Sequence, residues 1–313
     1  MPGRATTVGG CAAAALGVVC LLAAILSGAG CGGGPSRDGG EPALPTTGVV
    51  RVDGGDIRGS VDGSVSIYRG VPFAAPPVGP LRWRPPQPVR PWEGVRECVS
   101  FAPACPQQNV AGLAGRVSGP QSEDCLYLNI WSPAHAPGER LPVMVWIHGG
   151  GFVCGTASLP GRQAVSLSAG GRVVLVSVSY RLGIFGYLAL SSLSRESADG
   201  ISGNYGLLDQ IAALRWVRRN IAAFGGDPRR VTVFGQSAGG QSVIALLVSP
   251  RSRGLFARAV VESARYEDRG IGLWATRPLA AQVREGEPIA TGLGAPPGDG
   301  RLTPLRPLGA ARL

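Results

Sequence analysis

The chain has 313 residues, a length that suits one large domain or two small ones. Hydrophobic residues make up 44% of it, which is enough to build a buried core, and the formal net charge is +10. All 30 basic residues are arginine, and they are scattered along the chain. A nucleic-acid binder usually clusters its basic residues and also uses lysine, so the composition argues against nucleic-acid binding.

The N-terminal segment, residues 1–31, predicts a targeting signal. An unbroken apolar stretch of 16 residues, Cys11–Leu26, is shorter than a membrane-spanning helix requires. The small residues of Ser27–Ala29 fit ordinary signal-peptide cleavage. Alternatively, Cys31 fits a bacterial lipoprotein box, in which a lipid on this cysteine would tether the protein to a membrane. An uncleaved anchor is the third interpretation. We expect a secreted protein or one attached to the cell envelope.

Residues 32–46 are rich in Gly and Pro and predict a flexible linker. Short strands are expected at 49–52 and 64–69, where apolar residues alternate with polar ones. A proline-dense stretch follows at 72–91, and proline density excludes both helices and central strands there.

The middle of the chain alternates between strand and helix patterns. Strands are expected at 126–131, 141–148, 173–180, 231–234 and 257–262, and helices at 207–221 and 238–247. This order predicts an α/β fold with a mostly parallel central sheet, flanking helices and a small N-terminal β-sheet. The C-terminal segment, residues 266–313, is expected to be poorly ordered or incomplete, with one short helix at 278–290.

The motif with the clearest chemistry is Gly-Gln-Ser-Ala-Gly at 235–239, between an expected strand and an expected helix. A Gly-x-Ser-x-Gly turn in that context forms a nucleophile elbow, which presents the serine hydroxyl to substrate. Ser237 is therefore the candidate nucleophile. The backbone amide of Ala238 and the glycine run at 148–152 are candidate donors to the oxyanion that forms during acyl transfer.

Several stretches of the sequence are similar to those of a known family. The stretches are 68–74, 76–79, 122–129, 148–152, 179–183, 203–210 and 235–239. Together they resemble the type B carboxylesterases, the family that includes the cholinesterases, over residues 47–265. The resemblance implies the N-terminal portion of an α/β-hydrolase domain that lacks the C-terminal part of the fold.

The resemblance also implies roles for single residues. Ser237 corresponds to the acyl-accepting nucleophile, and Gly150, Gly151 and Ala238 correspond to the oxyanion hole. Phe152 is expected to line the acyl or alcohol pocket; simple packing in the core is the alternative.

Four cysteines follow the leader. In the resembled pattern Cys105 and Cys125 form a disulfide that closes a surface loop, which stabilises the fold by about 3 kcal/mol in the chain-entropy model. Cys98 and Cys154 have no counterpart in that pattern, so they either pair with each other or remain free thiols.

Two ion pairs are also implied by the resemblance. Arg82 pairs with Glu123 and Arg181 pairs with Asp209, in structural and not catalytic roles. Removing one partner of a buried pair costs about 3–5 kcal/mol.

The chain departs from the family pattern after the serine. The family's catalytic glutamate and histidine follow the nucleophile, but both histidines of this chain, His135 and His148, precede it. Neither is expected to act as the base. Gln236 also replaces the more usual glutamate beside the serine. We therefore expect the catalytic acid and base to be absent from these 313 residues.

Two functional hypotheses follow. The first is a carboxylic ester hydrolase that acts on a small-molecule ester through an acyl-enzyme and is inactive or impaired as a 313-residue chain. The second is a non-catalytic exported homologue that acts as a binding protein. An adhesion role is less favoured, because cholinesterase-like adhesion proteins usually lose the serine. No metal-ligand cluster or dinucleotide fingerprint is present, so neither a metal nor a cofactor is expected, and the oligomeric state stays open.

Overall fold

The computed structural model describes residues 44–108, 119–159, 161–264, 278–296 and 302–313. The predicted targeting signal, including Cys31, and most of the predicted linker lie outside the described residues.

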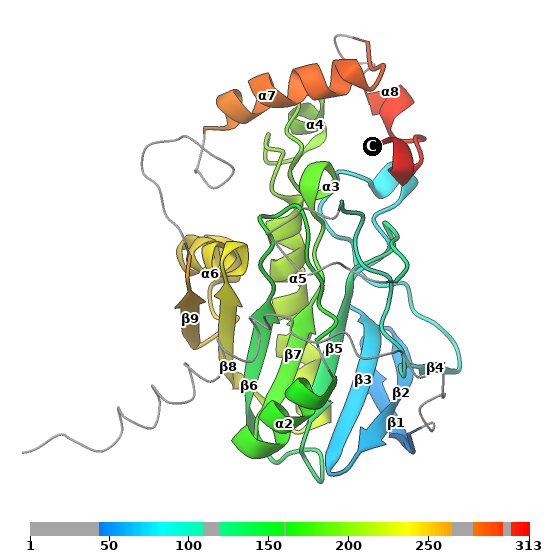
Figure 1. Cartoon of the computed structure of the whole chain (residues 1–313), viewed down its shortest axis with the longest axis vertical. Coiled ribbons are helices and arrows are strands. Elements are labelled where there is room, and N and C mark those ends of the chain that lie inside the picture. The colour runs from blue at the N-terminus through cyan, green and yellow to red at the C-terminus, as the bar shows by residue number, and fades with distance from the viewer. Residues whose placement is uncertain (1–43, 109–118, 160, 265–277, 297–301) are drawn as a thin grey trace, which may run out of the picture. The chain divides into compact units, whose positions relative to one another are not determined.

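The fold is organised around one nine-stranded sheet (Figure 1). Its strands run in the order β1-β2-β3-β5-β7-β6-β8-β9, and β4 pairs with β2 beside this path. The strands are β1 (Thr46–Val52), β2 (Gly55–Asp62), β3 (Val65–Pro72), β4 (Val95–Glu97), β5 (Tyr127–Ser132), β6 (Leu141–Ile147), β7 (Val174–Val178), β8 (Gly226–Gln236) and β9 (Arg258–Glu262).

The sheet has two halves with different pairing. Neighbours among β7, β6, β8 and β9 are parallel, whereas β1, β2, β3, β5 and β7 pair antiparallel along the sheet. The N-terminal strands therefore form no separate small sheet, and the sheet as a whole is mixed and not mostly parallel. The reason is that β3 pairs with β5, with Ile67 opposite Trp131, and so joins the N-terminal strands to the rest of the sheet. Strand β2 has no counterpart among the expected elements, because glycines interrupt its apolar alternation.

Helices connect and cover the strands. They are α2 (Gly161–Gly171), α3 (Gly183–Tyr187), α4 (Ser191–Glu196), α5 (Tyr205–Asn220), α6 (Ala238–Val248), α7 (Leu279–Gly292) and α8 (Leu302–Leu305). Single 3₁₀ turns lie at η1 (Gly79–Leu81), η2 (Ile221–Phe224), η3 (Pro250–Ser252) and η5 (Ala310–Arg312). The periodic residues Ile211, Leu214 and Val217 of α5 are all buried, as an amphipathic helix requires. No helix in the described parts of the chain is long and apolar enough to span a bilayer.

The main hydrophobic core lies between the sheet and its helices. Val143 and Val145 of β6 and Val233 of β8 are completely buried there, together with Leu246 of α6. Each such side chain contributes about 1.5–3 kcal/mol through its removal from water. Because the apolar runs of β6 and β8 are covered on both faces, they read as continuous and not alternating in the sequence.

A second cluster involves the C-terminal segment. Trp83 and Tyr205 pack there with Ala290 of α7 and with Leu302 and Leu305 of α8. Residues 278–296 and 302–313 of the segment expected to be poorly ordered or incomplete thus contain helices and buried apolar side chains. The segment has too few apolar residues for a strong periodic pattern, yet those it has are buried against distant parts of the chain.

Candidate active site

The predicted nucleophile lies in a sharp turn between β8 and α6. Ser237 has φ 57° and ψ −121°, a conformation that non-glycine residues rarely adopt. The turn is held by backbone hydrogen bonds: the Ser237 amide donates to the carbonyl of Glu262 at 2.9 Å, and the Gln241 amide donates to the carbonyl of Ser237 at 3.0 Å. The serine is partly exposed. This is the geometry of a nucleophile elbow.

The glycines of the motif allow the start of α6 to lie against β6. A Cβ added to Gly239 would lie 2.0 Å from the carbonyl oxygen of Ile147, and one added to Gly235 would lie 2.5 Å from the carbonyl carbon of Gly239. Both contacts are with backbone atoms, which have little freedom to move aside. The spacing of the motif therefore reflects close packing between the turn, the helix and the neighbouring strand.

The glycine run follows β6 and contacts the elbow directly. A Cβ on Gly149 would lie 2.6 Å from the Gln236 carbonyl oxygen and 3.2 Å from the Cβ of Ser237. Gly150 and Gly151 have φ values of 101° and 67°. The carbonyl oxygen of Gly150 accepts hydrogen bonds from the amides of Val153 and Cys154 at 3.1 and 3.0 Å.

These contacts place the loop after β6 beside the elbow, and the residues of the predicted oxyanion hole belong to these two segments. Gly150 and Gly151 lie in the loop after β6, Ala238 is the first residue of α6, and β6 and β8 are adjacent parallel strands. The helix N-terminus adds positive potential at the point where an oxyanion would form. Their role as donors stays a prediction.

His148 lies at the start of the glycine run and contacts it. Its ring stacks on Tyr180 with centroids 4.3 Å apart, and its Nδ1 lies 2.8 Å from the carbonyl oxygen of Gly149. The hydroxyl of Tyr180 donates to the carbonyl of His148 at 2.7 Å. Burial lowers the pKa of His148 to about 4, so the ring is neutral at pH 7. The histidine is engaged with its own loop and not with Ser237.

His135 lies at the other end of the sheet. It is exposed in the connection that precedes β6, whereas Ser237 follows the carboxyl end of the parallel strand β8. The seven residues of β6 separate the two ends by about 23 Å. In the described part of the chain, the hydroxyl of Ser237 has no hydrogen-bond partner. Neither histidine is in place to activate the serine.

Phe152 is partly buried against the main core, and its ring lies 5.2 Å from the ring of Tyr187. Its carbonyl oxygen accepts a hydrogen bond from the Gly183 amide at 2.7 Å. These contacts agree with the core-packing interpretation, and a pocket-lining role stays a prediction.

The ion pair between Arg181 and Asp209 is completely enclosed. Nε and Nη2 of the guanidinium donate to the two carboxylate oxygens at 2.8 and 2.7 Å, and the Arg181 amide adds a third bond at 3.1 Å. The side chains are 3% and 0% exposed. Burial raises the pKa of Asp209, while the positive charge of Arg181 opposes the rise. The pair fastens α5 to the loop after β7.

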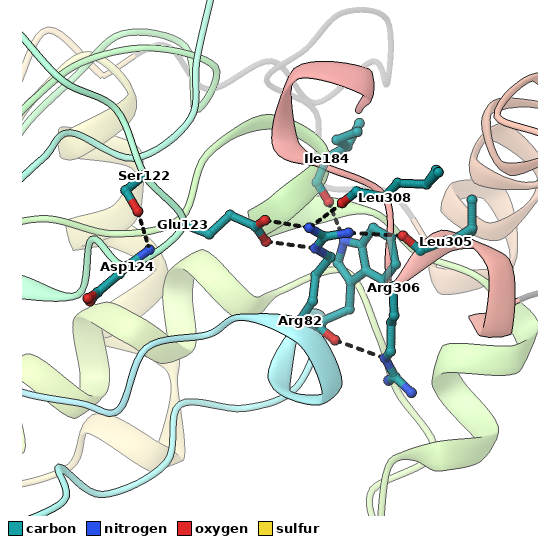
Figure 2. A network of polar contacts seen from close by, with 9 residues as sticks. Arg82, Ser122, Glu123, Asp124, Ile184, Leu305, Arg306 and Leu308 are labelled. Carbon is teal, nitrogen blue, oxygen red and sulfur yellow. Dashed lines mark hydrogen bonds and ion pairs between the residues drawn. The ribbon is translucent and has the colours of Figure 1, made fainter.

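The pair between Arg82 and Glu123 extends to the C-terminal segment (Figure 2). The Nε of Arg82 donates to Glu123 at 2.7 Å, and its Nη2 donates to the second carboxylate oxygen. Its Nη1 and Nη2 also donate to the carbonyl oxygens of Leu305 and Leu308 at 2.9 and 2.7 Å. We call Arg82, Glu123, Arg306, Glu196 and the carbonyls of Leu305 and Leu308 the arginine network.

Sequence reasoning missed the C-terminal members of this network. Arg306 donates to the two carboxylate oxygens of Glu196 at 3.0 and 2.6 Å and to the carbonyl of Arg82 at 3.4 Å. Residues 305–308 lie outside the stretch of resemblance, and their acceptors are main-chain atoms. A main-chain acceptor leaves no signal in a sequence.

The structure contains the Cys105–Cys125 disulfide, with Cα atoms 5.1 Å apart. Cys98 and Cys154 are both buried free thiols, which decides between the two alternatives for them. Burial raises the pKa of Cys98 to about 11, so its thiol is protonated at neutral pH. Within the residues that the structure describes, no His, Cys, Asp or Glu cluster could hold a metal ion.

Comparison with known proteins shows which family the chain resembles in sequence and in structure. A sequence model of the Carboxylesterase family matches residues 46–284. The chain is 48% identical over 247 residues to a fumonisin B1 esterase of Sphingopyxis macrogoltabida, covering 79% of this chain and 43% of the relative. It is 47% identical over 216 residues to a para-nitrobenzyl esterase of Bacillus subtilis, covering 69% of this chain and 43% of the relative.

Solved structures agree with the sequence relatives. A PNB esterase superposes with a TM-score of 0.73 at 40% identity, over 84% of this chain and 51% of that one. A carboxylesterase of Geobacillus stearothermophilus superposes with a TM-score of 0.72 at 42% identity, over 84% of this chain and 51% of that one. The chain thus spans about half the length of the proteins it matches, and its fold is that of the α/β-hydrolases. The chain belongs to the carboxylesterase family.

Proposed function

We propose that this chain carries the nucleophile of a serine carboxylesterase that hydrolyses small-molecule carboxylic esters. One observation supports this most strongly. Ser237 sits in a strained elbow, and the glycine loop of the neighbouring strand lies so close that a Cβ on Gly149 would be 3.2 Å from the serine Cβ. This close backbone packing supports the proposal, because acyl transfer needs a nucleophile and amide donors held near each other.

The proposed reaction proceeds through an acyl-enzyme. The hydroxyl oxygen of Ser237 attacks the ester carbonyl, and the amides of Gly150, Gly151 and Ala238 stabilise the resulting oxyanion. The alcohol leaves with a proton, and a water molecule then attacks the acyl-serine, which releases the acid and restores the hydroxyl. Attack by the serine requires a base to accept its proton.

The base is the missing part of this mechanism. His148 is stacked on Tyr180, and His135 lies at the opposite end of the sheet. The proposal is therefore an impaired hydrolase in the form of these 313 residues. With the donors in place but no base, a rate of roughly 10³–10⁴ above the reaction in water is expected.

The relatives support ester chemistry in general. One is named for fumonisin B1 and another for para-nitrobenzyl esters. We propose an ester substrate on this ground and assign no acyl or alcohol group. We also propose export, by secretion or by a lipid on Cys31, on the basis of the N-terminal sequence.

A second candidate is an exported binding protein without catalysis. The observation that favours it is the same absence of a base beside Ser237. It differs from the first candidate in one respect: the serine would form no covalent acyl intermediate.

Chemical rescue separates the two candidates. The purified chain is incubated with 4-nitrophenyl butyrate over a series of imidazole concentrations, and Ser237→Ala is the matched control. Nitrophenol release and intact mass are both followed, and the release by the variant is subtracted as background. Imidazole can accept the proton that the absent histidine would take.

For the first candidate we expect a Ser237-dependent rate that rises with imidazole, together with an acyl adduct absent from the variant. Identical release by both proteins, without an adduct at any imidazole concentration, would establish the second candidate. A high rate without imidazole would show that the chain supplies its own base, against the proposal of impairment.

A further inference from the structure

The chain folds back on itself directly after the glycine run, and we call residues 148–155 the oxyanion loop. Gly155 has φ 125°, a conformation that favours glycine. A Cβ added to it would lie 2.3 Å from Nδ1 of His148 and 2.6 Å from the carbonyl oxygen of Gly149. Since Gly155 lies against the first residues of the loop, its position and the shape of the loop depend on each other.

The side chain of Gln107 bonds to Gly155 through both ends of its amide group. Its Oε1 accepts a hydrogen bond from the Gly155 amide at 2.7 Å, and its Nε2 donates to the Gly155 carbonyl oxygen at 2.8 Å. Nε2 also donates to the carbonyl oxygen of Cys105 at 3.0 Å. Both N–H donors and the oxygen of the glutamine amide are thus engaged. Gln107 holds Gly155 as a neighbouring β-strand would hold it.

The backbone around Gln107 is itself fixed. Its amide donates to Oε1 of Gln121 at 2.9 Å. Ala104 forms an isolated β-bridge with Gln121, and the disulfide between Cys105 and Cys125 closes the same segment. Because its backbone is held, Gln107 loses little further conformational freedom when its side chain bonds to the oxyanion loop.

We propose that Gln107 is a positioning residue for ester hydrolysis: it holds Gly155 and so keeps Gly150 and Gly151 of the oxyanion loop in place beside Ser237. This inference rests on the proposed function. Stabilisation of an oxyanion depends on donors that are fixed before the reaction begins. Without Gln107 the backbone groups of Gly155 lose their partners, and the loop is free to adopt other conformations.

Hydrogen exchange tests the contact itself. Gln107→Met keeps the length of the side chain but removes its donors and its acceptor. We expect the Gly155 amide of this variant to exchange at least about tenfold faster, because the bond that protects it is absent. The matched control is Gln108→Met, the same substitution at the exposed neighbouring position, which should exchange like the unchanged chain. Thermal melting verifies that both variants are folded.

The rate of acylation tests the consequence for Ser237. Each protein is mixed with a series of 4-nitrophenyl butyrate concentrations at one high imidazole concentration, and the acyl adduct is followed by intact mass. We expect Gln107→Met to lower the maximal acylation rate by at least about tenfold and to leave the half-saturating ester concentration unchanged, because an oxyanion forms only in the transition state. Partial unfolding would instead lower the fraction of chains acylated. Gln108→Met should match the unchanged chain.

Two results would overturn the inference: equal exchange of the Gly155 amide in Gln107→Met and the unchanged chain, or faster exchange with an unaltered acylation rate. If Gln107→Met does not fold, Gln107→Glu carries both measurements with the same expected direction, because its second oxygen would face the carbonyl oxygens of Gly155 and Cys105. Absence of a Ser237 adduct in the unchanged chain would overturn the proposed function and the catalytic role of Gln107 with it. Hydrogen exchange would then still decide whether Gln107 holds the loop.

Discussion

The elbow and the arginine network are both tightly bonded, but by different kinds of atoms. Around Ser237 the critical contacts join backbone to backbone: Gly239 lies against Ile147, and Gly149 lies against Gln236. In the arginine network, side chains reach carboxylates and carbonyl oxygens. The backbone contacts at the elbow leave no room for an added atom. In the arginine network, a substitution can remove one hydrogen bond and leave the others in place.

This difference separates two ways of building a fold. Backbone packing positions the reactive groups precisely and tolerates almost no substitution. Side-chain bonding connects distant segments, here η1 with the C-terminal residues, and should weaken gradually when it is changed. Substitutions at the elbow should therefore destabilise the fold more than substitutions in the arginine network.

The largest effect is expected for Gly239→Ala at the elbow. Its Cβ would lie 2.0 Å from the carbonyl oxygen of Ile147, so either β6 or α6 has to shift. We expect a loss of at least about 3 kcal/mol in the free energy of unfolding, measured by urea denaturation. Gly170→Ala in α2 is the control, since nothing lies within 4 Å of its added Cβ. Equal stability of the two variants would contradict the backbone-packing argument.

The next effect concerns pH and His148. This histidine takes a proton near pH 6.5 in the unfolded chain and only near pH 4 in the folded one, because burial opposes its charge. Below pH 6.5 the unfolded state therefore binds the proton first, so stability is complete above that pH and falls toward pH 4. The difference of the two pKa values corresponds to about 3 kcal/mol.

Urea denaturation across this pH range checks the sign and size of the effect. His148→Phe keeps an aromatic ring against Tyr180 but cannot titrate, so its stability relative to the unchanged chain should improve as the pH falls. His135→Gln is the control, because this side chain is exposed. A pH profile of His148→Phe parallel to that of the unchanged chain would refute the assignment.

The smallest effects are expected in the arginine network. Glu123→Gln removes the charge that faces Arg82 but leaves the carbonyls of Leu305 and Leu308 as acceptors, and should cost about 2 kcal/mol. Arg306→Ala should cost at most about 1 kcal/mol, because this pair is partly exposed and Arg84 still lies 3.2 Å from Glu196. Urea denaturation of both variants measures the two losses in the free energy of unfolding. A larger loss for Arg306→Ala than for Glu123→Gln would contradict this expectation.

Much of the elbow could be predicted because its signal is local. The motif around Ser237 and the glycine run after β6 are short segments, and each needs only its neighbours in sequence to be recognised. The pairing of the strands was less predictable: β2 has a broken pattern, and the antiparallel pairing of β5 with β7 follows from contacts between separate segments. Helix α7 was expected, but its packing against Leu188 and Leu190 was not.

The amino-acid sequence was enough to identify the family, to predict Ser237 as the nucleophile and to show that His135 and His148 precede it, because residue identity and order along the chain carry that information. Only the tertiary structure showed that His148 is stacked on Tyr180 and that Arg82 donates to the carbonyl oxygen of Leu305, 223 positions away. These facts depend on which distant segments meet. Packing decides that, and main-chain acceptors have no signature in a list of side chains.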